Sequence, residues 1–153
     1  MQTTVVNLVQ LRAIRPEDGP WLWSVHRITM RSYVIETWGA WDDAGEREFL
    51  ERSYTVESMR IIQQDGRDVG LCEVQRRPGE RYLARFGVIP SRQHAGVGTA
   101  VLRLIQAEAQ QARQSLCLQV LKVNPARRLY ERTGFKLSGE TATHWLMRWW
   151  PEL

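Results

Sequence analysis

Apolar and polar positions along the chain follow two different spacings. Stretches of alternating or continuous apolar residues predict strands at 9–15, 59–64, 69–77, 81–89, 115–123, 135–139 and 143–150. Apolar residues at helical spacing predict helices over about 18–32, 43–54, 98–113 and 125–133. Strands dominate one stretch of this order and alternate with helices in another. The pattern predicts one α/β (α+β) domain over residues 1–153, with a mixed sheet of about seven strands and about four helices.

Short polar residues mark the predicted starts of the helices. Asp18 can cap the first helix, whose apolar pattern fades into an aromatic loop at 37–41. Asp43 and Glu46 have the spacing of a capping box, which predicts where the second helix begins. Asn124 is expected to cap the fourth helix, because a proline suited to the first helical position follows it.

The composition is that of a globular protein. The 153 residues, 43% hydrophobic and 25% charged, are enough to bury a core in one domain. No apolar run approaches the roughly 18 residues that span a bilayer. The beginning, MQTTVVNLVQLR, has neither a basic leader nor a long apolar stretch, so no signal peptide is predicted. These features predict a cytoplasmic protein without a membrane partner.

Two cysteines and a net charge of +4 bear on the choice of chemistry. Cys72 and Cys117 lie in separate strand-like runs without metal-ligand spacing, so both are interpreted as reduced structural residues. No metal site is predicted. The arginines are spread along the chain, whereas binding to a nucleic acid usually needs a clustered basic stripe. Nucleic acid therefore remains a minor alternative.

The most informative segment is FGVIPSRQHAGVGTAVLRLI, residues 86–105. A strand, a proline break and a glycine-bearing turn lead into an amphipathic helix. Gly96 and Gly98 remove side chains where the backbone must turn sharply and expose its N–H groups. Those groups lie at a helix N-terminus, where each favourable interaction with an anion contributes about 0.3–1 kcal/mol. Several converging N–H groups can therefore hold a pyrophosphate.

Other phosphate-binding loops fit this segment poorly. A dinucleotide fingerprint requires a third glycine where Val101 stands, and an acidic residue near Lys122 and Val123. A nucleoside-triphosphate loop requires a lysine after the last glycine, but Thr99 follows Gly98. Taken alone, the Gly-x-Gly turn is equally consistent with a structural turn that binds no ligand.

A second segment, LQVLKVNPARRLYERTGF at 118–135, supports a ligand. Ala126, Leu129 and Tyr130 share one face of its helix, and Gly134 ends it. With this segment the chain resembles the GNAT N-acetyltransferase superfamily. Residues 93–98, QHAGVG, match that family's Q/R-x-x-G-x-G/A cofactor motif. Asn124, Ala126, Tyr130 and Gly134–Phe135 match its second motif at the usual distance.

The resemblance implies acetyl-coenzyme A as the co-substrate. In this family the fourth and fifth strands splay apart and the pantetheine arm lies between them. The residues expected to contact it from the strand and from the other side are Phe86, Val88 (through its backbone), Ile89 and Asn124. The residues expected around the pyrophosphate are Arg92, Gln93, His94, Ala95, Gly96, Val97, Gly98 and Thr99.

Tyr130 stands where the family commonly has a tyrosine near the cofactor sulfur. A phenol with a pKa of about 10 can donate a proton to a thiolate with a pKa of about 8.5. The resemblance therefore implies that Tyr130 is the general acid, with Tyr130 also close to the cofactor. The alternative is a core tyrosine that completes the apolar face of its helix.

The base that deprotonates the acceptor is harder to predict. An amine with a pKa near 10.4 must lose a proton before it can attack, which costs roughly 4–5 kcal/mol at pH 7. Some relatives use a glutamate on the fourth strand, but residues 81–86 contain no acid. Glu36, next to the aromatic loop, is the first choice, and a solvated surface carboxylate is its alternative. Glu73 and His144 are weaker candidates, and His26 is interpreted as a packing group.

Trp38 and Trp41 are expected to line the acceptor pocket. The resulting prediction is an N-acetyltransferase that moves an acetyl group to a primary amine by direct attack in a ternary complex. The runner-up is a non-catalytic module that senses acyl-coenzyme A. The sequence leaves the acceptor open, and also the oligomeric state, a homodimer included.

Overall fold

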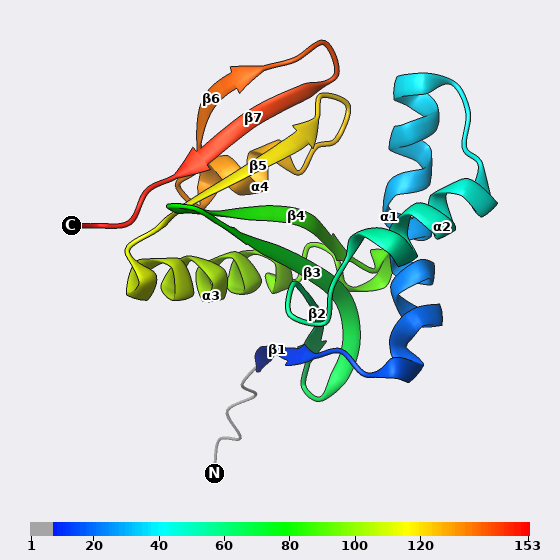
Figure 1. Ribbon diagram of the computed structural model, residues 1–153, viewed down its shortest axis with the longest axis horizontal. Coiled ribbons are helices and arrows are strands. Elements are labelled where there is room, and N and C mark those ends of the chain that lie inside the picture. The colour runs from blue at the N-terminus through cyan, green and yellow to red at the C-terminus, as the bar shows by residue number, and fades with distance from the viewer. Residues whose placement is uncertain (1–7) are drawn as a thin grey trace.

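A mixed sheet of seven strands lies at the centre of the protein (Figure 1). The computed structural model describes residues 8–153. Residues 1–7, on which the prediction about a signal peptide partly rests, lie outside the described residues. The strands are β1 Val9–Ala13, β2 Met59–Gln64, β3 Arg67–Arg77, β4 Glu80–Val88, β5 Ser115–Leu121, β6 Lys136–Glu140 and β7 His144–Trp149. The helices are α1 Gly19–Trp38, α2 Asp43–Ser53, α3 Val97–Ala112 and α4 Arg127–Arg132, with short 3-10 turns η1 Pro16–Asp18 and η2 Pro90–Arg92.

The strand order is β1-β2-β3-β4-β5-β7-β6, and only β4 and β5 run parallel to each other. They pair over a short distance, from Glu80 with Ser115 to Leu83 with Leu118. Beyond that point the register of β4 against β3 shifts, so that Ala84 has no partner on β3. A bulge of this kind bends the strand that carries it. In Figure 1, β4 and β5 lie close together at one end and diverge toward α1.

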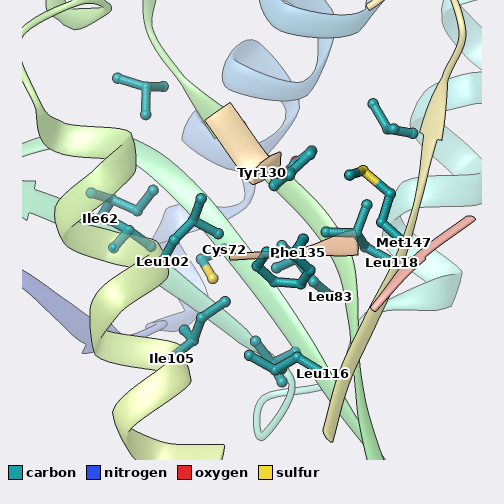
Figure 2. Packing of buried hydrophobic residues seen from close by; sticks show 14 of the residues in the cluster. Ile62, Cys72, Leu83, Leu102, Ile105, Leu116, Leu118, Tyr130, Phe135 and Met147 are labelled. Atoms are coloured by element: carbon teal, nitrogen blue, oxygen red, sulfur yellow. The ribbon is translucent and has the colours of Figure 1, made fainter. Parts of the chain in front are cut away.

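The helices cover the two faces of the sheet with separate apolar clusters. On one face, α1 and α2 contribute Leu22, Val25 and Leu50, which pack against residues of β2 and β3. On the other face, α3 supplies most of its apolar stripe to a larger cluster that also contains Tyr130 and Phe135. Figure 2 shows these two aromatic rings close to Leu118 and Met147. The sheet therefore divides the molecule into two layers that meet at the divergence of β4 and β5.

The predicted α/β architecture, with β4 and β5 splayed and four α-helices, is confirmed. The first helix is longer than predicted, because it continues to Trp38 and ends at Gly39, where φ is +86°. The aromatic loop predicted at 37–41 is thus partly helix. A glycine in the left-handed region is a common end of a helix, and the apolar pattern, which fades before Gly39, does not include that signal.

Two predicted caps differ from the structure. Asp43 does not cap α2: Asp42 is the N-cap residue, and the Asp43 carboxylate instead accepts hydrogen bonds from Arg27 and Trp41. Asn124 does not cap α4, which begins at Arg127 after Ala126. The Asn124 Oδ1 atom accepts a hydrogen bond from the Ala126 N–H at 2.9 Å, which closes a turn before the helix.

Among residues 8–153, no helix has both the length and the apolar composition needed to cross a bilayer. Over the same residues, no group of three or more His, Cys, Asp or Glu side chains is arranged to hold a metal. The cytoplasmic location stays a prediction.

Candidate active site

A cleft of about 680 Å³ lies where β4 and β5 diverge. Its walls come from both layers and from the sheet itself, with residues of α1, α2, β3, β4, β5, α4 and β7. Tyr130 and Phe86 line it from α4 and β4, and Asn124 from the segment after β5, while Trp38 and Phe49 line it from α1 and α2. One continuous cleft therefore joins the strand gap to the space beneath the first two helices.

The turn before α3 presents free backbone N–H groups. It is shaped by two residues in the left-handed region, His94 with φ +63° and Gly96 with φ +81°. The first backbone hydrogen bond of the helix is donated by Ala100 to Gly96. The N–H groups of residues 97–99 precede that bond and have no partner within the helix. These three N–H groups fall within residues 92–99, for which the sequence predicted contact with a pyrophosphate, and that contact stays a prediction.

Gly98 has a second reason to lack a side chain. A Cβ atom at this position would lie 2.8 Å from Leu129 Cδ2 and 3.6 Å from Phe86 Cζ. The start of α3 therefore packs directly against α4 and β4. Because α4 carries Tyr130, this contact links the position of the turn to the position of the tyrosine.

The end of β4 leads into the same turn. Val88 and Ile89 are buried or half-buried, and the Val88 carbonyl accepts a hydrogen bond from the Gln93 side chain at 2.9 Å. Phe86 lines the cleft, and its ring centroid is 6.3 Å from that of Tyr130. Of the cofactor residues predicted on β4 and the turn, only Phe86 lines the cleft; Val88, Ile89 and residues 92–99 follow it along the chain outside the lining, and their contact with a cofactor stays a prediction.

Tyr130 is buried, with 6% of its surface exposed, and it lines the cleft. Phe135 packs against its ring edge-on, at a centroid distance of 5.7 Å. Burial raises the pKa of its phenol well above the ordinary value, so the hydroxyl is protonated at neutral pH. The ring of Tyr130 therefore belongs to the core, as the alternative interpretation had it, while the residue also borders the cleft; its role as general acid stays a prediction.

A buried ion pair forms part of the floor beneath α2. Glu73 on β3 is fully buried, and its carboxylate accepts hydrogen bonds from Arg85 Nη1 at 2.6 Å and from Ser58 Oγ at 2.8 Å. The other terminal nitrogen of Arg85 donates to Ser53 Oγ at 2.7 Å. Glu73 is thus fully engaged with partners, which argues against it as a free base, whereas Arg85 lines the cleft.

The remaining base candidates lie in different surroundings. Glu36 is exposed on α1 and is not among the side chains that line the cleft, so its role stays a prediction that the geometry does not support. His144 on β7 does line the cleft, with its Nδ1 atom 2.8 Å from Thr143 Oγ1, and burial lowers its pKa. The one acid of β4, Glu80, accepts a hydrogen bond from Arg148 at 2.8 Å, away from the cleft lining.

The two tryptophans predicted for the acceptor pocket separate. Trp38 lines the cleft with 57% of its surface exposed, and its ring centroid is 6.2 Å from that of His144. Trp41 instead stacks on Trp23 at 6.1 Å and packs beside His26 at 5.9 Å. Trp41 therefore does not line the cleft itself but packs against His26, which does.

Several cleft residues were not predicted from the sequence. Asp42, Glu46 and Phe49 lie four and three positions apart, so they share the face of α2 that borders the cleft. Phe49 is 56% exposed, so its ring offers apolar surface to the cleft. The helical spacing of these residues was the available signal. Met30 and Arg85 had no comparable signal, because their position depends on how α1 and β4 pack.

Both cysteines are free thiols, as predicted. Cys72 is fully buried in the core, and burial raises its pKa to about 12. Cys117 is half-buried beside Glu80, and burial raises its pKa to about 11. Neither thiol has the lowered pKa of a nucleophilic cysteine.

Solved structures with the same fold cover nearly the whole chain. The PaiA N-acetyltransferase from Thermoplasma acidophilum, in complex with coenzyme A, is 16% identical, with a TM-score of 0.74 over 94% of this chain and 99% of that one. The ribosomal-protein-S18-alanine N-acetyltransferase from Escherichia coli is 18% identical, with a TM-score of 0.69 over 95% and 96%. The histone acetyltransferase HPA2 and related acetyltransferase from Corynebacterium glutamicum is 20% identical, with a TM-score of 0.73 over 95% and 97%. At these identities the likeness shows the fold. A comparison with curated proteins finds no significant match.

The sequence also matches a family model, described as the acetyltransferase (GNAT) domain, over residues 55–137. This stretch is more than half of the chain and runs from just before β2 into β6. It contains the glycine-bearing turn before α3, the strand gap and Tyr130. The chain therefore belongs to the GNAT acetyltransferase family.

Proposed function

We propose that the protein transfers an acetyl group from acetyl-coenzyme A to a primary amine by direct attack in a ternary complex. The observation that carries this proposal is the single cleft that runs from the strand gap to α1 and α2. We call the β4–β5 gap and Tyr130, together with the turn of residues 92–99 that follows β4, the cofactor half; the turn adjoins the cleft through the end of β4 and does not itself line it. The part formed by α1, α2 and the strand floor beneath them is the acceptor half. Two reactants that meet in one cleft can react without a covalent enzyme intermediate.

The cofactor half fits the chemistry of coenzyme A. The N–H groups of residues 97–99 have no helical partner, which suits a pyrophosphate. The edge of β4 beyond Leu83 is no longer paired with β5, so its backbone groups are available to an extended amide-containing arm. Acetyl-coenzyme A supplies the acetyl group as an activated thioester. Gln93 would steady the turn through its bond to the Val88 carbonyl, and Asn124 would border the arm from the β5 side.

Tyr130 is proposed as the general acid. Its raised pKa keeps the proton on the hydroxyl until a strong acceptor arrives. A thiolate with a pKa of about 8.5 in water is such an acceptor when it forms in a buried site. The tyrosine hydroxyl would donate its proton to the departing sulfur, which makes the return reaction less favourable.

The acceptor half suits an amine attached to an apolar group. Trp38, Phe49 and Met30 supply apolar surface, while Asp42 and Glu46 supply negative charge that attracts an ammonium group. The named acceptors of the structural neighbours include a ribosomal-protein alanine, which shows how varied acceptors on this fold are. We therefore propose the class of acceptor and not its identity.

The decisive experiment is incubation of the protein with acetyl-coenzyme A and a pooled amine library, followed by mass spectrometry. We expect at least one primary amine to gain an acetyl mass in proportion to enzyme. Tight binding of coenzyme A without transfer to any amine, and without hydrolysis of the thioester, would instead support a sensor of acyl-coenzyme A. Calorimetry with coenzyme A in parallel separates the two outcomes.

A further inference from the structure

The acceptor half holds few groups that can take a proton from an ammonium ion. The carboxylates and imidazoles that line the cleft are Asp42, Glu46, His26 and His144. Asp42 is exposed to solvent, whereas Glu46 is partly buried. His144 lies apart on β7, beside Trp38. Glu46 and His26 lie next to each other on α2 and α1, with Glu46 half-buried and His26 more deeply buried.

His26 and Glu46 face each other across the junction of α1 and α2. The distance from His26 Nε2 to Glu46 Oε2 is 3.7 Å, and the two side chains are 12% and 31% exposed. The Nε2 atom is buried and has no hydrogen-bond partner among the described residues. Such an unpaired atom costs free energy, and its persistence in an ordered wall calls for a function.

The wall around His26 holds its ring in place. The ring lies against Trp23 and Trp41, at centroid distances of 6.2 Å and 5.9 Å. Trp41 is in turn bonded through its indole nitrogen to Asp43 at the start of α2. The aromatic packing therefore holds the imidazole with its Nε2 atom toward Glu46. Glu46 itself lines the cleft, so its carboxylate can reach an acceptor there.

The charges around the pair favour a neutral imidazole and a basic carboxylate. Burial, aided by the charge of Arg85 on β4, lowers the pKa of His26 to about 4. Burial and the neighbouring Asp42 raise the pKa of Glu46, while Arg85 acts in the opposite direction. The effect of Arg85 is moderated because Glu73 of β3 binds its guanidinium. From β7, His144 also lines the cleft, and burial lowers its pKa.

We propose that Glu46 is the general base of the transfer and that His26 is its positioning residue. The proton leaves the acceptor ammonium nitrogen for a Glu46 carboxylate oxygen, and the resulting acid donates a hydrogen bond to the unpaired Nε2 of His26. The freed nitrogen lone pair then forms the bond to the acetyl carbon as the carbon–sulfur bond breaks and the electron pair leaves on sulfur. The nitrogen loses its second proton to solvent as it becomes the amide, and the sulfur takes a proton from Tyr130. Tyr130 regains a proton from solvent and Glu46 releases its proton to solvent, so one proton is released overall. This assignment rests on the proposed acetyl transfer.

The first test is the pH dependence of kcat/KM for Glu46→Gln. At pH 7 we expect a loss of about 10²-fold or more, because a positioned base contributes that much. The rate of the variant should then rise tenfold per pH unit toward the pKa of the amine, near 10.4, and approach that of the wild type, since solution now supplies the free amine. Glu48→Gln is the matched control, because Glu48 lies on the same helix, is 68% exposed and is absent from the cleft lining.

A loss in Glu46→Gln that is equal at every pH indicates a merely structural role and overturns the proposal, as does an unchanged profile. If His144→Gln removes the acid limb and Glu46→Gln does not, the base is His144 and the proposal is wrong. In each of these cases the amine acetylation by the wild type still stands, so the proposed function survives.

The second test needs no activity. Carbon-13 NMR of the carboxyl groups follows the titration of Glu46 in the wild type and in His26→Phe, a change that keeps an aromatic ring but removes the nitrogen. We expect Glu46 to titrate above the ordinary glutamate value of about 4.3 and to titrate lower in His26→Phe, because the protonated acid loses its acceptor. An ordinary titration that His26→Phe leaves unchanged overturns the proposal. If the wild type acetylates no amine, the proposed function fails and the base assignment falls with it.

Discussion

The two halves of the cleft are built from different kinds of interaction. The cofactor half depends on the backbone: free N–H groups before α3, an unpaired stretch of β4, and two glycines that allow the turn and its packing. The acceptor half depends on side chains: the Glu73–Arg85 pair, the His26–Glu46 pair and the aromatic wall of α1 and α2.

This difference explains what each half can tolerate. Backbone geometry serves any ligand that carries the same pyrophosphate and amide groups, so one arrangement suits a co-substrate that never changes. Side chains can be exchanged one at a time without altering the chain path, so the acceptor half can be adapted to a particular amine. Four substitutions test whether the two halves are as separate as they look, and they are ordered by the size of the expected effect.

Glu73→Ala should have the largest effect. It leaves the buried guanidinium of Arg85 without its carboxylate partner, which we expect to lower the free energy of unfolding by about 3–5 kcal/mol. Urea denaturation measures this loss. Glu51→Ala breaks the exposed pair with Arg47 and should change stability by about 0.5 kcal/mol or less. Equal losses in the two variants would show that the floor of the acceptor half does not depend on the buried pair.

His26 should make the stability depend on pH. Its folded-state pKa of about 4 lies below the ordinary 6.5, so the unfolded chain binds the proton more readily between these values. The stability contributed by the neutral imidazole is complete above about pH 6.5 and falls as the pH drops toward 4, by about 3 kcal/mol in all. In His26→Phe this part of the pH dependence should vanish from denaturation curves. A wild-type stability that stays level over this window would contradict the burial of the ring.

Tyr130→Phe should lower the turnover about 10²-fold, equivalent to about 2.7 kcal/mol in the barrier, if the phenol is the proton donor. The affinity for coenzyme A should hardly change, because the ring and its contact with Phe135 remain. Steady-state kinetics and calorimetry measure the two quantities. Tyr33→Phe, on α1 and outside the cleft lining, is the matched control. An unchanged rate in Tyr130→Phe removes the acid role and leaves Tyr130 a core residue.

Gly96→Ala should have the smallest effect on folding. The glycine has φ +81° and nothing within 4 Å of an added Cβ, so the expected cost is the backbone strain of about 1–2 kcal/mol. Relaxation of the turn should also weaken coenzyme A binding, measured by calorimetry. Gly66→Ala is the matched control, because Gly66 has φ +79° and equally open surroundings in the β2–β3 turn. It should cost the same stability and leave coenzyme A affinity unchanged. Equal affinities in both variants would show that the conformation at Gly96 does not matter for the cofactor.

Most of the fold could be predicted from local patterns. Each strand and α-helix was expected within a few residues of its bounds, since alternation and helical spacing are local consequences of burial. The errors lie at the ends of helices. α1 continues to Trp38 and ends at the left-handed Gly39. Asp43, the predicted cap of α2, instead accepts a hydrogen bond from Arg27. The first end is marked by a glycine that the apolar pattern does not include, whereas the second depends on Arg27, 16 residues away along the chain.

The amino-acid sequence by itself determined the two local motifs of the cofactor half, the turn at 93–98 and the segment at 124–135, because each is made by consecutive residues. A glycine-bearing turn and a short helix that carries a tyrosine can be identified from adjacent residues, whatever the rest of the chain does. Only the tertiary structure decided the acceptor half. Glu46 meets His26, and Arg85 meets Glu73, through the packing of α1 and α2 on the sheet. Such pairs have no fixed spacing along the chain, since the distance between two side chains on different elements is set by how those elements pack and not by the residues between them.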